Sequence, residues 1–536
     1  MKAGVLNSVL MRMFDNRISV FMVFLFAFAS FNYWPNWAKN LSNQVLDLQI
    51  SALHSLGYHD EIDPNVVVVE VDDKAIDEFG RWPWRRSLSA ALFGKFESAS
   101  IVVADIVFSE QSEESEDEIL AETFVNNDNV ILGFFLRGEE QEQGSEQAYS
   151  YIETCALQRV QQLSSFVDLP AVKNAEVNIP LIAKSALSCA LFTVTADSDG
   201  LYRHYPLLYV YQDLVLPTMA LQAFQFHSNR ELTALLDSKG VARLQGKDLL
   251  IEGENQLLVN FPRQIHRVSA SQVLNNSLAA DYFDDKIVLV GLSEIGLYDI
   301  RPTNLDPYTP GVHIHAAALS NLLQGNWYRQ NPGLSLGLTL ISILLLTAMT
   351  KWFPGHPIRW GLYAGYFALV TVTASYYLHA HHQALDLFEI LLFSVLTLAF
   401  IEGENFVVVH RQYRSVKSAF STYVVPEIVD DIVEQGMSTE QKGVLKEVTV
   451  LFSDIQDFTQ ITEELQPEQI ITLLNTVFTP VTEQIIHNQG MLDKYIWDEV
   501  MAVFNAPIDI PDYQNKSIDA AIGIQTSIQD TNKQLE

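Results

Sequence analysis

The sequence predicts an α/β domain, four membrane-spanning helices and a smaller α+β domain at its C-terminal end. Hydrophobic residues make up 48% of the 536 residues, and the mean hydropathy is +0.10, which is high for a soluble protein. In the first half of the chain, apolar strand-like runs alternate with helical patterns, as they do in α/β domains. Four apolar runs have about the length that crosses a membrane. After the last of them come a strand, a long helix and a hairpin.

Composition excludes some classes of function. The formal charge is −32, from 33 basic and 65 acidic residues, and this balance argues against a nucleic-acid partner. An acidic, solvated protein surface accounts for this negative charge. The two cysteines, Cys155 and Cys189, cannot build a zinc site by themselves.

The first apolar run extends from Ile18 to Trp37 and has an aromatic outer end. A cleaved signal peptide is the alternative, because Ala27-Phe28-Ala29 resembles a cleavage site. The length of the run and its aromatic belt favour an uncleaved anchor. We therefore assign residues 1–37 to a cytoplasmic N-terminus and the first transmembrane helix.

Three further runs lie within residues 333–401, at Gly333 to Thr350, Trp360 to Leu378 and Ala384 to Ile401. Short loops join them, so they are predicted to be membrane spans rather than buried core helices. They contain almost no ionisable residues, which argues against a transporter; Asp386 and Glu389 lie near one end of the last run.

Positive charge in the loops predicts the orientation. Basic side chains occur before the first span, between the second and third spans, and after the fourth. They are Lys2, Arg12, Arg17, Lys351, Arg359, His410, Arg411, Arg414 and Lys417. With both termini cytoplasmic, residues 38–332 lie outside the inner (plasma) membrane and residues 402–536 inside. Disulfides persist outside the cytoplasm, but the sequence leaves open whether Cys155 and Cys189 are bonded.

The outer domain begins with a helical stretch and two apolar strands. The runs Asn65 to Asp73 and Ala99 to Glu110 flank a Gly-Arg-Trp-Pro-Trp turn and a helix. This order predicts a βαβ unit with a parallel sheet. A further buried strand is predicted at Asp285 to Gly291.

Several segments of residues 38–332 resemble the CHASE2 family of extracytoplasmic sensor domains. They are DPNVVVVEVDDKAI, GRWPW, VVADIVFSE, DSDGLYRHYPL, DKIVLVGLSEIGLYD and PYTPGVHIHAAALSNLLQG. The resemblance implies a sensory role with an extracytoplasmic ligand, whose identity the sequence does not reveal.

Acidic residues in this domain permit two interpretations. Carboxylates at strand ends bind hard cations, but they also cap helices or pair with Arg81 and Arg203. We favour the structural interpretation for Asp72, Asp73, Asp105, Asp197 and Asp199. The alternating His313 and His315 suit a strand or a turn and are also interpreted as structural.

Residues 402–446 are predicted to form a helical connector, which either pairs with a second chain or acts as a passive tether. Residues 447–536 begin with an apolar strand that ends at Asp454. A helix from Pro467 to Asn488, a hairpin that presents Asp498 and a final helix from about Tyr513 follow. Two carboxylates are thus predicted at one edge of a sheet, an arrangement that two-metal chemistry on phosphates requires.

The motifs VTVLFSDI, FT, LLNTVF and DKYI-x-D-x-VMAVF-x-AP closely resemble the catalytic domain of class III adenylate/guanylate cyclases, which has a ferredoxin-like α+β fold. The resemblance implies that Asp454, the Ile455 carbonyl and Asp498 bind two Mg²⁺ or Mn²⁺ ions. It also implies that Phe458 and Thr459 contact the substrate.

The same resemblance implies that Lys494 reads the purine. A lysine suits an acceptor on adenine, so ATP is the expected substrate, although GTP remains open. The family forms a cyclic nucleotide and pyrophosphate at an interface between two domains, so the resemblance implies a homodimer. The predicted spans place this homodimer in contact with membrane lipid.

Three features depart from the family. The chain stops at Glu536, before the strands that bring the family's Asn and Arg, so no catalytic residue of that kind is expected here and we expect this chain to be inert. Trp497 stands where glycine is usual, in a turn that needs a positive φ. Asp457 stands where glycine is often found. The alternative function is a non-catalytic membrane receptor whose inner domain dimerises with or regulates a partner.

Overall fold

The computed structural model describes residues 20–535 with gaps. The chain divides into two compact units, and the boundary falls between Ile401 and Glu402. Each unit is described by itself. The gaps are residue 22 and residues 30–33, 138–145, 163–170, 173, 230–232, 237–241, 245–246, 250–255, 294–299, 354–356, 421–444, 464 and 507–508.

The first unit contains a seven-stranded sheet with the order β15-β1-β16-β2-β3-β6, and β7 also pairs with β3. All its pairs are parallel except β3 with β6. The strands are β1 (Val66–Val71), β2 (Ile101–Ala104), β3 (Val130–Arg137), β6 (Asn174–Glu176), β7 (Ser188–Leu191), β15 (Arg267–Ser269) and β16 (Ile287–Leu292). This confirms the predicted βαβ unit and parallel sheet.

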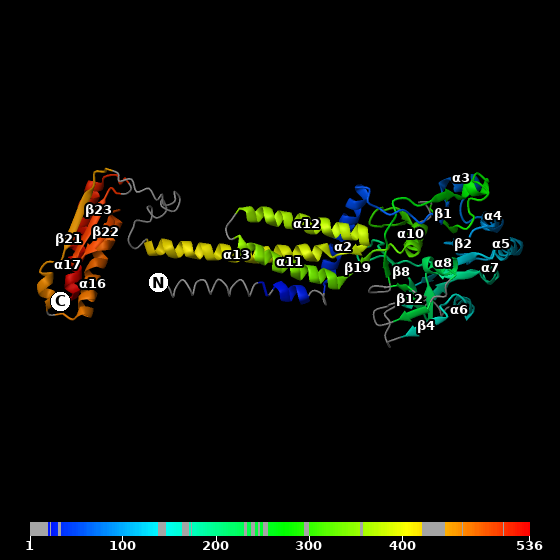
Figure 1. The fold of residues 1–536 in the computed structure, drawn as a ribbon, viewed down its shortest axis with the longest axis horizontal. Coiled ribbons are helices and arrows are strands. Elements are labelled where there is room, and N and C mark those ends of the chain that lie inside the picture. The colour runs from blue at the N-terminus through cyan, green and yellow to red at the C-terminus, as the bar shows by residue number, and fades with distance from the viewer. Residues whose placement is uncertain are drawn as a thin grey trace. The chain divides into compact units, whose positions relative to one another are not determined.

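Helices cover both faces of this sheet, which is why β1 is an unbroken run of buried apolar residues and one glutamate. Val66 and Val68 pack with α8 (Met219–His227) and α10 (Gly311–Gln324) in one core. Val67 and Val69 pack into a second core with other helices (Figure 1). Those are α3 (Asp73–Phe79), α4 (Arg86–Phe93), α5 (Glu114–Asn127) and α9 (Ala270–Leu274).

A close contact places α10 on the sheet. A Cβ atom at Gly291 would lie 2.6 Å from Cβ of Val312, so only glycine permits this helix to approach β16. α10 contains both His313 and His315. The prediction of a strand or turn for these histidines is therefore wrong.

A third core surrounds Cys155 and Cys189, which form a disulfide with their Cα atoms 5.4 Å apart. The elements beside it are α6 (Glu146–Glu153), β7, β9 (Leu208–Tyr211) and β10 (Leu214–Pro217). The smaller elements of the unit include η1 (Gly94–Phe96), β4 (Arg159–Gln162), β5 (Ala171–Val172), α7 (Pro180–Ser185), β8 (His204–Pro206), β11 (Thr233–Leu236), β12 (Ala242–Leu244), β13 (Lys247–Leu249), β14 (Gln256–Leu258), β17 (Ile300–Arg301) and β18 (Thr309–Pro310).

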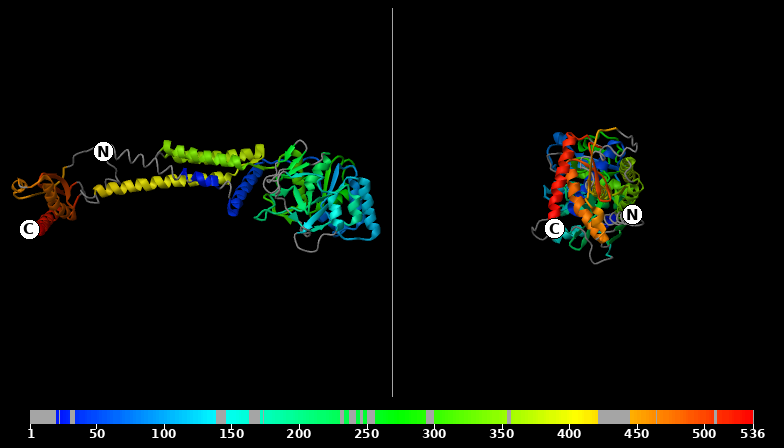
Figure 2. Two further views of the ribbon diagram at one scale, coloured as in Figure 1. Left: turned by 90° about the horizontal axis from the view of Figure 1, so that it is seen from below. Right: turned by 90° about the vertical axis from the view of Figure 1, so that its left-hand side faces the viewer.

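Long helices form the rest of this unit: α2 (Asn36–Ser55), α11 (Pro332–Trp352), α12 (Ile358–His381) and the part of α13 (Leu387–Phe420) up to Ile401 (Figures 1 and 2). α13 starts three residues later than predicted, because Gln383–Ala384 form β20, which pairs with β19 (Arg329–Gln330). It also continues past Ile401, so the predicted boundary between span and connector lies within one helix.

Two helical segments among the described residues are long and apolar enough to cross a membrane: Pro332–Trp352 and Leu387–Gln412. Only 33% and 22% of their apolar stretches are buried, which is unlike the core helices of a soluble domain. α12 is not among them, and the first predicted span falls partly outside the described residues. Four spanning helices are therefore not confirmed.

The second unit contains an antiparallel sheet with the order β21-β23-β22, formed by β21 (Thr449–Asp454), β22 (Met491–Ile496) and β23 (Glu499–Phe504). The other elements are α15 (Phe458–Glu463), α16 (Pro467–His487) and α17 (Tyr513–Leu535). α16 and α17 share a core with the sheet. This confirms the predicted order of strand, helix, hairpin and helix. Of the helical connector predicted at residues 402–446, residues 421–444 lie outside the described residues.

Candidate active site

The two predicted metal-binding carboxylates lie at one end of the three-stranded sheet. β21 ends at Asp454, whose register partner on β23 is Glu499. Asp498 directly precedes Glu499 in the turn between β22 and β23. Antiparallel pairing therefore brings the end of the first strand beside the hairpin turn. Sequence reasoning missed Glu499 because only the strand register reveals that it faces Asp454.

The chemistry of this edge is that of hard oxygen donors. The side chain of Asp454 is exposed, and its Oδ1 accepts a 3.0 Å hydrogen bond from the Ile455 amide. Asp498 is half-buried. Carboxylate and carbonyl oxygens are the ligands that Mg²⁺ and Mn²⁺ favour, so this donor set fits such ions. Within the described ranges, no group of three or more His, Cys, Asp or Glu side chains is arranged to hold a metal.

Two turns beside these carboxylates have left-handed backbone conformations. Asp457 has φ = 58° just before α15, and Trp497 has φ = 58° in the hairpin turn. Both positions were identified from the sequence as ones where the cyclase family has glycine. Trp497 is 86% exposed, so packing of the indole does little to offset the backbone cost.

The predicted substrate-binding residues surround this edge. Phe458 and Thr459 form the first turn of α15, where the Phe458 amide donates to the Ile455 carbonyl at 3.3 Å. Lys494 follows a bulge in β22 and is largely exposed. Its Nζ lies 3.1 Å from Oδ2 of Asp493. The structure thus leaves the lysine on the surface of the strand that leads to Asp498.

A groove of about 630 Å³ lies between α16 and the hairpin. The rings of Phe478 and Tyr495 stack at 4.8 Å, and the Tyr495 hydroxyl lies 2.9 Å from the Thr482 hydroxyl. The other residues that line the groove are Ile471, Leu474, Asn475, Thr479, Glu483, Ile486 and Trp497. No sequence motif pointed to this groove.

In the first unit, three of the five acidic residues weighed as metal ligands have structural partners. Asp72 caps α3 through the Ala75 amide and accepts a 2.6 Å hydrogen bond from Ser269. Asp197 and Asp199 both pair with Arg203, as the structural interpretation expected.

Arg203 also pairs with Asp47 of α2, at 2.6 Å. Only 1% of the Arg203 side chain is exposed. Sequence reasoning missed Asp47, which is separated from Arg203 by 156 positions.

The two histidines of α10 contact buried partners. Nε2 of His313 lies 2.5 Å from Glu70 of β1, and Nδ1 of His315 lies 2.8 Å from the Tyr205 hydroxyl. Burial disfavours ionisation of Glu70, but His313, Arg267 and Ser293 together outweigh it and lower the pKa of Glu70. Burial lowers the pKa of His315 to about 3, so this side chain is neutral at pH 7.

Comparison with known proteins divides the chain in the same way. Residues 19–349 match the CHASE2 domain family, and residues 440–536 match the adenylate and guanylate cyclase catalytic domain. A segment of 96 residues is 33% identical to "Adenylate cyclase, terminal-differentiation specific" of Dictyostelium discoideum, covering 18% of this chain and 4% of that protein. A segment of 89 residues is 34% identical to "Adenylate cyclase 1" of Rhizobium meliloti, covering 17% and 13%. The match therefore spans less than a fifth of either relative.

Among solved structures, the guanylyl cyclase Cya2 is 29% identical, with a TM-score of 0.16, over 16% of this chain and 44% of that chain. The adenylyl cyclase CyaB from P. aeruginosa is 28% identical, with a TM-score of 0.16, over 16% and 46%. At these TM-scores the superpositions carry no weight, and the assignment rests on the family matches.

Proposed function

The chain belongs to the CHASE2 domain family and carries a class III cyclase catalytic domain, and from this we propose that it is a membrane-bound sensor adenylate cyclase. In this proposal, an extracytoplasmic signal received by residues 38–332 controls the conversion of ATP to cyclic AMP and pyrophosphate by the domain that starts near residue 447. The matching cyclases of Dictyostelium discoideum and Rhizobium meliloti support the reaction class.

The observation that carries the proposal is the placement of Asp454 and Asp498 at one edge of the sheet. These carboxylates and the Ile455 carbonyl would hold two Mg²⁺ or Mn²⁺ ions. Such ions, when bound, supply positive charge to the triphosphate and lower the pKa of the attacking 3′-hydroxyl. The first turn of α15, with Phe458 and Thr459, would lie against the phosphates.

The choice of ATP rests on Lys494. An ammonium group donates hydrogen bonds and accepts none, so it suits an acceptor on adenine. Because 59% of its side chain is exposed, Lys494 can turn from Asp493 toward a substrate. The proposed enzyme is a homodimer that pairs through the cyclase domain and the connector, and the exposed apolar side chains of Val450, Phe452 and Trp497 offer surface for that contact.

The proposed topology has four spans with both termini in the cytoplasm. Supporting it, Val23 and Ala27 from the first apolar run pack against Ile343 of α11 and Phe393 of α13. α12 packs beside them through Tyr363 and other apolar side chains, while its outward face exposes residues such as Leu369 and Val372. Apolar side chains that point away from a helix bundle are what lipid would cover.

A second candidate is a receptor without catalysis whose inner domain regulates a partner. Trp497 favours it, because its exposed indole in the turn beside Asp498 would crowd a nucleotide bound at that carboxylate.

The experiment that separates these functions measures cyclic-nucleotide formation in membranes that contain the product of the whole native gene. ATP and GTP are supplied with Mg²⁺ or Mn²⁺, and the variants are Asp454→Ala and Lys494→Glu. We expect cyclic AMP from the parent protein, at least 100-fold less from Asp454→Ala, and a shift toward GTP for Lys494→Glu. A folded, membrane-inserted protein that forms no product from either nucleotide would favour the receptor.

A further inference from the structure

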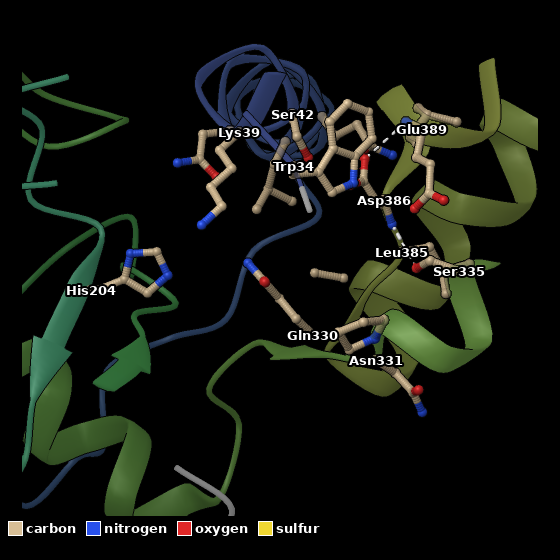
Figure 3. A pocket seen from close by; sticks show the side chains of 16 residues that line it. Trp34, Lys39, Ser42, His204, Gln330, Asn331, Ser335, Leu385, Asp386 and Glu389 are labelled. Atoms are coloured by element: carbon tan, nitrogen blue, oxygen red, sulfur yellow. Dashed lines mark hydrogen bonds between the residues drawn. The ribbon is translucent and has the colours of Figure 1, made fainter. Parts of the chain in front are cut away.

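A cavity of about 380 Å³ lies within the first unit, where the α/β domain meets the apolar helices (Figure 3). Its walls come from α2, β8, the paired strands β19 and β20, and the first turns of α11 and α13. Its volume falls within the range of about 300–1,000 Å³ that small-molecule sites occupy. Six elements around this junction thus contribute to one cavity.

A buried acid in this cavity lacks a partner. The side chain of Glu389 is 5% exposed, and its Oε1 has no hydrogen-bond partner among the described residues. A buried carboxylate oxygen without a donor destabilises the folded state, because it has lost its hydrogen bonds to water. Glu389 is in the first turn of α13, so the positive end of the helix supports its charge without filling its hydrogen-bonding capacity.

The neighbouring polar groups are already engaged. Asp386 accepts a 2.9 Å hydrogen bond from the Glu389 amide, and its own amide donates to the Ser335 hydroxyl at 3.0 Å (Figure 3). Nδ1 of His204 lies 2.8 Å from Asp197. Glu389 is therefore the acid of this cavity that a ligand can still satisfy.

Lys39 of α2 supplies a charge of the opposite sign. Its side chain is exposed, it lines the cavity, and it makes no ion pair within the described part of the chain. The aromatic ring of Trp34 lines the same space and can contact a cation through its face. Within the described residues, the cavity thus offers a carboxylate oxygen without a hydrogen-bond partner, a lysine without an ion pair and an aromatic surface.

We propose that this cavity binds a small zwitterion, whose primary ammonium group donates to Glu389 and whose anionic group pairs with Lys39. A primary ammonium is required because the buried oxygen needs an N–H donor, which a trimethylammonium group lacks. Two sources share this chemistry: a free amino acid in the outer compartment, or the headgroup of phosphatidylethanolamine. Occupancy would hold α2 and α13 together and so link ligand binding to the apolar helices.

The test uses the whole protein in nanodiscs of phosphatidylcholine. Glycine and phosphoethanolamine are titrated by calorimetry, and in a second arm phosphatidylethanolamine is added and its retention is measured by native mass spectrometry. The variants are Glu389→Gln and Lys39→Met. The matched controls are Glu118→Gln and Lys74→Met, whose side chains are exposed on α5 and α3.

We expect binding in one arm that weakens at least tenfold in Glu389→Gln and in Lys39→Met and is unchanged in both controls. Binding of the soluble probes would identify the ligand as a free zwitterion. Retention of the lipid without binding of the soluble probes would identify it as the lipid headgroup. Absence of binding in both arms, or binding that neither variant weakens, overturns the proposal. If near-ultraviolet circular dichroism shows that Glu389→Gln does not fold, binding to the Lys39→Met variant alone tests the proposal. Binding is read directly, so the result does not depend on cyclase activity.

Discussion

Arg203 is the residue whose removal should most destabilise the first unit. Its guanidinium is 1% exposed and pairs with Asp47, Asp197 and Asp199, at 2.6–3.1 Å. Arg203→Leu leaves three carboxylates together without their cation, and breaking a buried ion pair in this way costs about 3–5 kcal/mol. The measurement is thermal unfolding of the whole protein followed by near-ultraviolet circular dichroism.

The exposed Arg81 provides the control for this prediction, and Arg81→Leu should change the unfolding temperature little. Arg203→Lys should recover only part of the loss, because an ammonium group cannot form the two-pronged bonds that the guanidinium makes with Asp47 and Asp199. A midpoint for Arg203→Leu equal to that of Arg81→Leu would contradict the prediction.

Trp497 should be a residue at which a substitution stabilises the second unit. Its φ of 58° costs a non-glycine residue about 1–2 kcal/mol. Its exposed indole returns little of that cost. Trp497→Gly should therefore slow hydrogen exchange of the β22 and β23 amides by roughly the factor of 5 that about 1 kcal/mol represents.

Asp457→Gly is the matched comparison, since Asp457 has the same φ. Aspartate tolerates the left-handed region better than tryptophan does, so the gain should be smaller there. Faster exchange in Trp497→Gly would mean that contacts of the indole in the groove outweigh the strain.

At the scale of elements, the C-terminal end of α12 is tied to the segment that follows α2. Nε2 of His382 lies 2.8 Å from Oδ2 of Asp60, which also accepts a hydrogen bond of 2.5 Å from Asn260. The hydrogen bond from His382 is the main cause that lowers the pKa of Asp60, with Asn260 acting in the same direction and burial opposing it.

This attachment should weaken in acid. A carboxylate whose pKa is lowered by folding stabilises the folded state above its ordinary value of 3.8, and that contribution is lost as the pH falls through the lower folded pKa. Thermal unfolding between pH 7 and pH 2.5 should show a loss of stability below about pH 4, and Asp60→Asn should reduce this loss while lowering stability at pH 7. An unchanged pH profile in Asp60→Asn would refute the role of Asp60.

Elements defined by local pattern could be predicted from the sequence, and those defined by distant pairing could not. The apolar run of β1 predicts a strand buried on both faces, and the structure confirms it. β20 has two residues and exists only because it pairs with Arg329–Gln330, so no local pattern indicates it. The start of α13 had a local signal that was missed: Asp386 caps the helix through the Glu389 amide.

The candidate site shows the same division. Asp454 and Asp498 were identifiable because motifs mark them, and the turn at Trp497 has the positive φ that the sequence predicted. The pairing of Glu499 with Asp454 could not be predicted without knowing the strand register. The cavity around Glu389 needs six elements from four regions of the chain, and none of them carries a recognisable signal in isolation.

At the scale of the whole molecule, the proposed topology places Glu110 outside the membrane and Trp352 and Glu447 inside. All three side chains are exposed and lie in described segments, so a cysteine at each would be accessible to a maleimide. The native Cys155 and Cys189 are paired in a disulfide and should contribute no background. Labelling by a membrane-impermeant maleimide therefore reports the side of the membrane directly.

In intact cells, or spheroplasts if the cell has an outer membrane, we expect Glu110→Cys to be labelled. Trp352→Cys and Glu447→Cys should be labelled only after the membrane is permeabilised. Trp352 is the decisive position, because it is the last residue of α11 and reaches the cytoplasm only if α11 crosses fully. With Glu447 also inside, α12 and α13 must together cross an even number of times. A crossing by the apolar α13 therefore requires that α12 cross as well, although α12 is not among the helices that composition alone identifies. Labelling of Trp352→Cys from outside would mean that α11 does not cross, and the orientation inferred from Lys351 and Arg359 would then be wrong.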